Sequence, residues 1–424
     1  MKRLLMRLFL GILLLLALAS CGAILLTQRD PHDLPPPKVV LGFCPNHPPT
    51  VSVTTPIPTT PAHTIYTSGG WNLYALDART GAMRWCRQAM VTNDYDRSKG
   101  GQPPAMFIGQ PALAGAPPAT IFFGQPTVTD GVVYVCASGF GEGQTYAFRA
   151  DDGALLWQAT SGCWVVSMPF ADNAVPLVDH GVIYSGPDAL WARDGQVIWT
   201  TPAGERYFSP QALVDGVLYA NDEQSVYALD ATNGSVRWKY TAPDGSPPGG
   251  RLAVADGHVF YGTLDSVDGS ETSALYALNA RNGALLWKST MATYSNPTAT
   301  GGLVYIGSAD HTLYALQASD GAARWRYTAP SSVYTATTVA GGVAYAILDG
   351  SYALDAVTGK LLWHRPLDAN QSISFTPIAL AGNVVYLGRT DGVGNCVLYA
   401  LNAATGATYW QLSGIRPIMP LVVE

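Results

Sequence analysis

The side chains best able to do chemistry in this sequence are seven histidines, and their spacing decides which chemistry is open to them. A zinc site needs paired ligands, and covalent haem needs a C-x-x-C-H motif; neither pattern occurs. No G-x-S-x-G motif marks a nucleophilic serine either. We therefore expect single histidines with structural or solvent contacts, at His32, His47, His63, His180, His258, His311 and His364.

One acidic stretch, DYDRSKG at 94–100, resembles a calcium-binding loop. Its glycine falls one place later than such a loop requires, and its twelfth position is Ala105 where a bidentate Glu is needed. The stretch is better explained as a polar turn, so we expect no metal site there.

The six cysteines and the amino-terminal segment give information about the cellular compartment of the protein. The opening MKRLLMRLFLGILLLLALASCGAILL has three positive charges, an apolar stretch and small residues before Cys21. This is the layout of a secretory signal peptide, residues 1–20, with a lipidation site at Cys21. The alternative is an uncleaved membrane anchor, since residues 8–26 are long enough to span. Both place the rest outside the cytoplasm, held to a bacterial membrane.

The remaining five cysteines leave two arrangements open. An odd number in an oxidising compartment allows two disulfides and a free thiol, with pairing that cannot be deduced. Cys86 and Cys136 fall within strand-like runs, so buried free thiols are the alternative there. The other three are Cys44, Cys163 and Cys396.

Composition excludes some partners. The formal net charge is −6, and removing residues 1–20 with their three cations makes it more negative. Nucleic acid is therefore an unsuitable ligand, because phosphate binding relies on clustered Lys and Arg. Residues 21–62 form a proline-rich linker, within which the apolar KVVLGFC (38–44) is expected to dock on the folded domain.

The folded part of the chain that positions these side chains is built from a sequence repeat. A phrase of apolar and aromatic residues, a Gly-containing turn and a final Trp recurs along the chain, and it is typical of two antiparallel strands. The copies are LYALDARTGAMRW (73–85), TYAFRADDGALLW (145–157), VYALDATNGSVRW (226–238), LYALNARNGALLW (275–287), LYALQASDGAARW (313–325), SYALDAVTGKLLW (351–363) and LYALNAATGATYW (398–410).

An eighth copy, LWARDGQVIW (190–199), is interpreted as shortened by three residues, with Ala192 at the place of Ala75. A second pair of strand-like runs precedes most copies. From Trp157 onward the repeats average about 42 residues, the size of one four-stranded propeller blade. The sequence therefore predicts an all-β fold: an eight-bladed β-propeller of four-stranded antiparallel blades over residues 63–424.

The first repeat lacks one strand, and the carboxyl-terminal IMPLVVE (418–424) resembles the opening strand of another repeat. We expect this terminal strand to complete blade 1 and close the ring. The recurring indoles are expected to fill the seams between blades as structural docking residues: Trp85, Trp157, Trp199, Trp238, Trp287, Trp325, Trp363 and Trp410.

The pattern A-x-D-x-x-T-G-x-x-x-W, complete at Ala75–Trp85 and Ala353–Trp363, resembles the tryptophan-docking repeat of the pyrroloquinoline quinone (PQQ)-like β-propellers. Two branches of that family differ in function. The resemblance implies either a quinoprotein dehydrogenase of alcohols or sugars, using PQQ and calcium, or a cofactor-free assembly lipoprotein of the BamB type. The sequence lacks the adjacent cysteine pair of the quinoproteins, so it resembles BamB more, and we expect no cofactor.

The strongest departure from the repeat is an insertion at about 91–122, rich in Pro and Gly. Long loops on a rigid scaffold usually carry recognition. Our hypothesis is a membrane-tethered, monomeric scaffold without catalytic residues, which binds other envelope or surface proteins. The alternatives are a PQQ-dependent dehydrogenase and a ligand sensor that binds through the insertion. Candidate partner-binding residues are Tyr95, Met106, Phe107 and Trp164.

Overall fold

Strands and the turns between them make up the described part of the chain, with no helix among those residues. The computed structural model describes residues 38–42, 50–54, 57, 63–69, 72–92, 122–138, 143–161, 163, 175–201, 208–263, 273–291, 295–308, 310–330, 337–366, 371–372, 378–391, 396–415 and 422–423. In these ranges no helix is long and apolar enough to cross a membrane.

The repeated phrase forms the third and fourth strands of each sheet. In blade 4 these are β17 (Ser225–Asp230) and β18 (Val236–Thr241). β17 is buried along its length because neighbouring blades cover both of its faces, whereas the outer β18 buries mainly Trp238. The turn between them has Gly234 at φ +72°, a conformation that costs glycine little.

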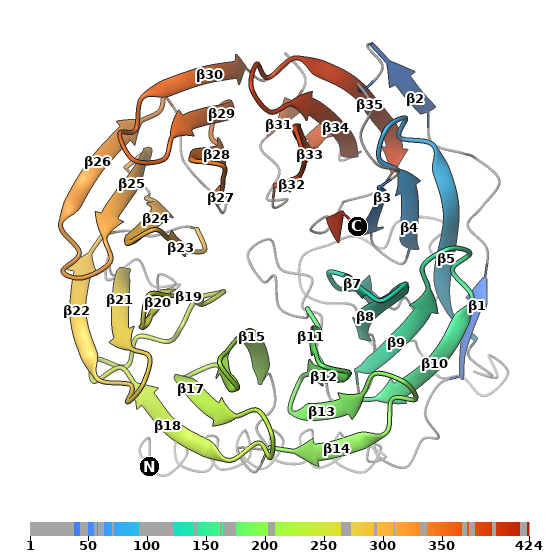
Figure 1. The fold of residues 1–424 in the computed structure, drawn as a ribbon, viewed down its shortest axis with the longest axis horizontal. Helices are drawn as coiled ribbons and strands as arrows, with labels where there is room; N and C mark the ends of the chain where they lie inside the picture. Colours follow the sequence, from blue (N-terminus) through green and yellow to red (C-terminus); the bar gives the residue numbers. More distant parts are fainter. Residues whose placement is uncertain are drawn as a thin grey trace, which may run out of the picture. The chain divides into compact units, whose positions relative to one another are not determined.

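Eight sheets follow one another around a ring, which confirms the predicted eight-bladed propeller (Figure 1). Blades 3 to 7 each have four antiparallel strands, in the order in which they occur in the chain. Their bounds are β11 (Leu177–Asp179), β12 (Val182–Ser185), β13 (Asp188–Trp191), β14 (Val197–Thr200), β15 (Ser209–Val214), β16 (Val217–Asn221), β17, β18, β19 (Ala253–Ala255), β20 (His258–Gly262), β21 (Ala274–Asn279), β22 (Leu285–Thr290), β23 (Thr298–Thr300), β24 (Leu303–Gly307), β25 (Thr312–Gln317), β26 (Ala323–Thr328), β27 (Thr338–Ala340), β28 (Val343–Ile347), β29 (Gly350–Asp355) and β30 (Leu361–Pro366).

The other three blades carry additional strands. Blade 2 has β6 (Phe122–Phe123) and β7 (Thr127–Thr129), both paired with β8 (Val132–Ser138), then β9 (Gln144–Arg149) and β10 (Leu155–Thr160). Blade 8 has β31 (Gln371–Ser372) and β32 (Ala379–Ala381), both paired with β33 (Val384–Asp391), then β34 (Cys396–Asn402), β35 (Thr408–Ile415) and β2 (Thr50–Val53). Blade 1 comprises β36 (Val422–Val423), β3 (Thr64–Gly69), β4 (Asn72–Asp77), β5 (Met83–Thr92) and β1 (Lys38–Gly42).

The ring closes as the sequence predicted. β36, from the end of the chain, pairs antiparallel with β3, so that Val423 lies opposite Ile65 and Val422 opposite Tyr66. The pairing covers the inner edge of β3, which would otherwise expose unpaired backbone groups.

Two further strands come from the segment expected to be a linker. β1 extends blade 1 beyond β5, and β2 extends blade 8 beyond β35, both on the outside of the ring (Figure 1). The apolar run at 38–44 thus contributes to a sheet, although neither strand forms a blade of its own. Ile57, a few residues after β2, is buried in the cluster that joins blades 1 and 8.

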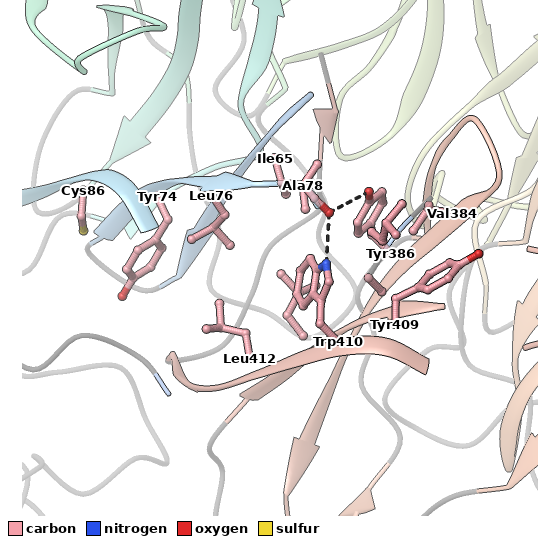
Figure 2. Close-up of a cluster of buried hydrophobic side chains, with 13 residues drawn as sticks. Ile65, Tyr74, Leu76, Ala78, Cys86, Val384, Tyr386, Tyr409, Trp410 and Leu412 are labelled. Carbon is pink, nitrogen blue, oxygen red and sulfur yellow. Dashed lines mark hydrogen bonds between the residues drawn. The ribbon is translucent and has the colours of Figure 1, made fainter. Parts of the chain in front are cut away.

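The hydrophobic core is divided among the seams. The cluster of Figure 2 combines Leu76 and Ile65 of blade 1 with Tyr386, Trp410 and Leu412 of blade 8. Similar clusters join the other neighbouring blades. Each sheet therefore buries its faces against its neighbours, as the repeat architecture requires.

Candidate functional site

The eight repeated tryptophans lie in the seams, each on the fourth strand of its blade. Every indole Nε1 donates a hydrogen bond to an alanine carbonyl in the next blade, at 2.7 to 3.2 Å. The donor and acceptor pairs are Trp85–Ala150, Trp157–Ala192, Trp199–Ala231, Trp238–Ala280, Trp287–Ala318, Trp325–Ala356, Trp363–Ala403 and Trp410–Ala78. These indoles are therefore engaged in packing between blades.

A second donor reaches most of these carbonyls. At the seam of blades 8 and 1, Trp410 Nε1 and the Tyr386 hydroxyl donate to the Ala78 oxygen at 3.0 and 3.1 Å (Figure 2). The equivalent tyrosine in blade 5 is replaced by Phe260, so the described structure gives Ala318 the indole of Trp287 as its one side-chain donor.

The same indoles also restrict which residue can occupy the turn after the third strand. Gly283 has φ +70°, and a Cβ added to it would lie 2.6 Å from the ring of Trp238. Its equivalents around the ring also face the indole of the preceding blade. Gly257, in a different turn, has φ +76° but open space around a Cβ. The repeat therefore needs glycine after the third strand for two reasons, backbone conformation and contact with Trp.

The prediction that the copy at 190–199 lacks three residues is wrong. Ala189 pairs with Trp199 across the sheet, as Ala75 pairs with Trp85, so Ala189 and not Ala192 is the equivalent of Ala75. Ala192 instead supplies the carbonyl that accepts from Trp157. The copy is of full length.

Trp191 caused that misreading and is a residue that sequence reasoning missed. It stands where five of the other seven copies have an Asp or Asn, and it is 36% exposed with the Arg193 guanidinium 4.7 Å from its ring centroid. At the same place in blade 1, Asp77 accepts hydrogen bonds from the backbone N–H groups of Arg79 and Thr80. An indole at the position of a turn carboxylate was the available signal for a surface role.

The two faces of the ring differ. Because the strands alternate in direction, the connections from first to second and from third to fourth strand share one face, and all others share the opposite face. The first face has short glycine turns, such as Ala255–His258 and Asn279–Leu285. The strand ends joined by the long connections lie on the opposite face, as at Gly262 and Ala274, Thr160 and Leu177, and Thr92 and Phe122. We call it the long-loop face.

Both anchors of the insertion lie on the long-loop face. β5 ends at Thr92, and β6 begins at Phe122, opposite Ser138. The candidate partner-binding residues Tyr95, Met106, Phe107 and Trp164 lie outside the described residues, as do Cys21 and the acidic stretch at 94–100.

The cysteines exclude one of the two arrangements that the sequence left open. Cys136 of β8 forms a disulfide with Cys163, and Cys86 is disulfide-bonded as well, so the hypothesis of buried free thiols at Cys86 and Cys136 is wrong. Burial within a strand does not distinguish a thiol from a disulfide, because both are apolar. The Cys136–Cys163 bond attaches the long β10–β11 connection, next to Trp164, to blade 2.

Polar side chains from several blades meet inside the ring, around the segment that leads into β19. The Arg251 guanidinium, before β19 of blade 5, donates to the Gln125 side-chain oxygen, before β7 of blade 2. The Asn296 side-chain oxygen accepts from the Arg251 backbone N–H at 2.9 Å, and Asn221 donates to the Gly250 carbonyl at 3.2 Å. These amides and the guanidinium can exchange hydrogen bonds with a ligand, but none is a general acid or base at neutral pH.

The carboxylates with perturbed pKa values are held by neighbours. At the edge of blade 5, Lys288 and Tyr276 donate to the Asp244 carboxylate at 2.6 and 2.9 Å, and the Lys288 bond is the main cause that lowers the pKa of Asp244. Burial raises the pKa of Asp188, against the bond from Thr200. Within the described ranges, no three His, Cys, Asp or Glu side chains are grouped to hold a metal ion.

Comparison with known proteins shows which family model this chain matches. The family model described as outer membrane protein assembly factor BamB matches residues 45–186, 188–273 and 270–417. A serine/threonine-protein kinase named AfsK, from Streptomyces coelicolor, is 32% identical over 256 residues, 58% of this chain and 27% of the kinase. The AfsK of Streptomyces griseus is 29% identical over 238 residues, 53% of this chain and 25% of the kinase. The chain thus spans about a quarter of the length of these curated relatives.

Solved structures are also similar to this chain, and one of them shows the same fold. The computationally designed protein Ika8 superposes with a TM-score of 0.54 at 14% identity, over 70% of this chain and 88% of the design. BamB from Moraxella catarrhalis gives 0.47 at 20% identity, over 70% of this chain and 80% of BamB. At 14% identity, the likeness to Ika8 concerns the fold alone.

Proposed function

Because the chain belongs to the family described as outer membrane protein assembly factor BamB, we propose that it is an extracytoplasmic scaffold that binds other envelope proteins without catalysing a reaction. The observation that carries the proposal is the contrast between a ring whose seams are closed by repeated hydrogen bonds and one face that receives the long connections. Such loops on a rigid framework are the usual place for recognition.

The recognition surface in this proposal is the insertion between Thr92 and Phe122, together with Trp164, which follows the disulfide-bonded Cys163 in the chain. Deleting residues 93–121 should abolish capture of the partner from native membranes. Thermal unfolding should change little, because both anchors belong to strands that remain paired. As a matched control, we would shorten the long connection 264–272 of blade 5. Equal loss of partner binding in both variants, or equal loss of stability and binding after the deletion, would refute the assignment.

The tether in this proposal is lipid on Cys21. The variant Cys21→Ser should move the protein from the membrane fraction to the soluble extracytoplasmic fraction, while the far-UV circular dichroism spectrum stays that of the parent. Retention of Cys21→Ser in the membrane would favour the uncleaved anchor at residues 8–26 instead.

A second candidate function, a ligand sensor, is favoured by one observation. The regions similar to this chain occupy about a quarter of proteins named serine/threonine-protein kinases, so repeats of this kind occur within larger signalling proteins. A sensor should bind a peptide or glycan in a calorimeter as isolated protein, whereas a scaffold should need a folded protein partner. Dye reduction with alcohols or sugars after addition of PQQ and calcium would overturn both candidates in favour of a dehydrogenase.

A further inference from the structure

Charge is unevenly distributed between the outer strands and the rest of the chain. The fourth strands of the eight blades contain eight of the 24 Lys and Arg residues and none of the 30 Asp and Glu residues. An acidic protein therefore has a perimeter whose described outer strands carry cations alone. The cations are Arg84, Arg87, Arg237, Lys239, Lys288, Arg324, Arg326 and Arg365.

The outer edges of two blades already accept an added strand. β2 pairs antiparallel with β35, with Ser52 opposite Gln411, and the Thr54 N–H donates to the Tyr409 carbonyl at 2.8 Å. β1 occupies the equivalent edge of β5 in blade 1. The outer strands of blades 2 to 7 end their sheets among the described residues, so their outward N–H and C=O groups face no further strand there (Figure 1).

The edge of blade 6 combines open backbone groups with exposed cations. Arg324 and Arg326 of β26 are exposed, and neither guanidinium makes a hydrogen bond or an ion pair with a carboxylate in the part of the chain that the structure describes. In contrast, Arg237 of blade 4 is paired with Asp230, and Lys288 of blade 5 with Asp244.

The direction of the open groups follows from the register. The Ala329 N–H donates inward to the His311 carbonyl, and the direction alternates along a strand, so the N–H and C=O of Arg326 point away from β25. Arg326 pairs with Tyr314 as Gln411 pairs with Tyr399 in blade 8, where β2 covers the edge. The same backbone position is thus covered in blade 8 and open in blade 6.

We propose that the outer edge of β26 binds an extended acidic segment of a partner protein as an added strand, with Arg324 and Arg326 pairing with its carboxylates. This inference rests on the proposed scaffold function and names the chemistry of one partner. The backbone bonds would supply affinity and the two arginines the selection for acidic sequences. An anionic membrane surface would match the charge but leave the ordered N–H and C=O groups of the edge without a paired strand.

Edge cations have a competing explanation, because like charges on every copy prevent self-pairing of open strands. Binding of an acidic peptide distinguishes the two explanations. Protection against self-pairing predicts no binding of an acidic strand and visible self-association when the cations are removed. The proposal predicts specific binding that the same substitutions abolish.

The probe is a short fluorescein-labelled peptide in which glutamate alternates with threonine or valine, and its binding to the full-length protein is measured by fluorescence anisotropy. The control peptide has lysine in place of glutamate. Arg324→Glu/Arg326→Glu should weaken binding of the glutamate peptide at least about tenfold, since two opposite charges become like charges. The matched control Arg84→Gln, on the covered edge of blade 1, should leave the affinity unchanged.

A second pair of variants distinguishes the contribution of the backbone N–H to peptide binding from that of the arginine charge. Arg326→Gln keeps the outward N–H, and Arg326→Pro removes it at an edge position where proline is tolerated. We expect Arg326→Pro to bind several-fold more weakly than Arg326→Gln, with unchanged unfolding curves. Equal affinities of these two variants, equal binding of the lysine peptide, or binding to phosphatidylglycerol vesicles without binding of the peptide would each overturn the proposal. Deletion of residues 93–121 should not affect peptide binding, so failure of the insertion as a recognition surface is distinguishable.

Discussion

Replacing one seam indole by phenylalanine should cost far more in blade 5 than in blade 7. Trp287 and Trp363 are both half-buried and donate to Ala318 and Ala403 at 2.9 and 2.8 Å. Their neighbouring rings, Phe260 and Tyr345, lie at nearly the same distance from the indole, with centroids 5.9 and 6.1 Å away. The difference is the Tyr345 hydroxyl, which also donates to Ala403, at 3.4 Å.

The magnitudes follow from the number of donors left. Trp363→Phe removes one of two hydrogen bonds to the carbonyl and should cost about 0.5–1.5 kcal/mol. Trp287→Phe leaves the Ala318 carbonyl without a side-chain donor in the seam, which should add about 1–3 kcal/mol for an unsatisfied buried group. Phe260→Tyr in the Trp287→Phe background should restore a donor and recover most of that difference.

Urea unfolding followed by far-UV circular dichroism measures these free energies without relying on indole fluorescence. The two single variants, the Phe260→Tyr single variant and the double variant form one comparison. Equal costs for Trp287→Phe and Trp363→Phe, or no recovery in the double variant, would show that the indole N–H bonds do not hold the seams together.

Three further predictions concern the turns, acid stability and the disulfide. Gly283→Ala should destabilise the protein by at least about 1 kcal/mol more than Gly257→Ala in urea, because both strain a positive φ but the first also drives a Cβ into Trp238; equal costs would exclude the indole contact. The Thr232 hydroxyl and then Arg237 lower the pKa of Asp230 from 3.8 to about 2, so its contribution to stability is complete above about pH 4 and is lost as pH falls toward 2. Asp230→Asn should therefore make the urea midpoint less dependent on pH in that window, and an unchanged pH dependence would contradict this. Replacing Cys136 and Cys163 by alanine should cost about 3–4 kcal/mol, since the bond closes a loop of 27 residues, and a urea midpoint equal to that of the parent would contradict this.

Most of the architecture could be predicted because it repeats. A Trp at the same place in each copy and a Gly in each turn imply one local structure used many times. The first repeat has only one strand-like run, beginning at His63, before its phrase, and this implied that the chain end closes the ring. The same reasoning failed at residues 190–199, because Leu190-Trp191-Ala192 imitates the apolar-aromatic-Ala opening of the other copies, whereas Ala189 is the residue that pairs with Trp199. It also could not name the alanine that accepts each indole bond, since that acceptor is a backbone carbonyl of the next blade and carries no side-chain signature.

The two proposed binding surfaces were also predictable only in part. The insertion at 91–122 was visible as excess length, and its anchors on the long-loop face follow from strand direction alone. The cations of the outer strands were visible in the sequence, but their meaning depends on which edges are open. β2 covers β35 while β26 stays uncovered in the described structure, and this is a contact between segments far apart in the chain. Local sequence thus determined strands, turns and their number, because these depend on neighbouring residues; tertiary structure decided which carbonyls, cysteines and strand edges meet, because those pairings bring together residues that the chain order separates.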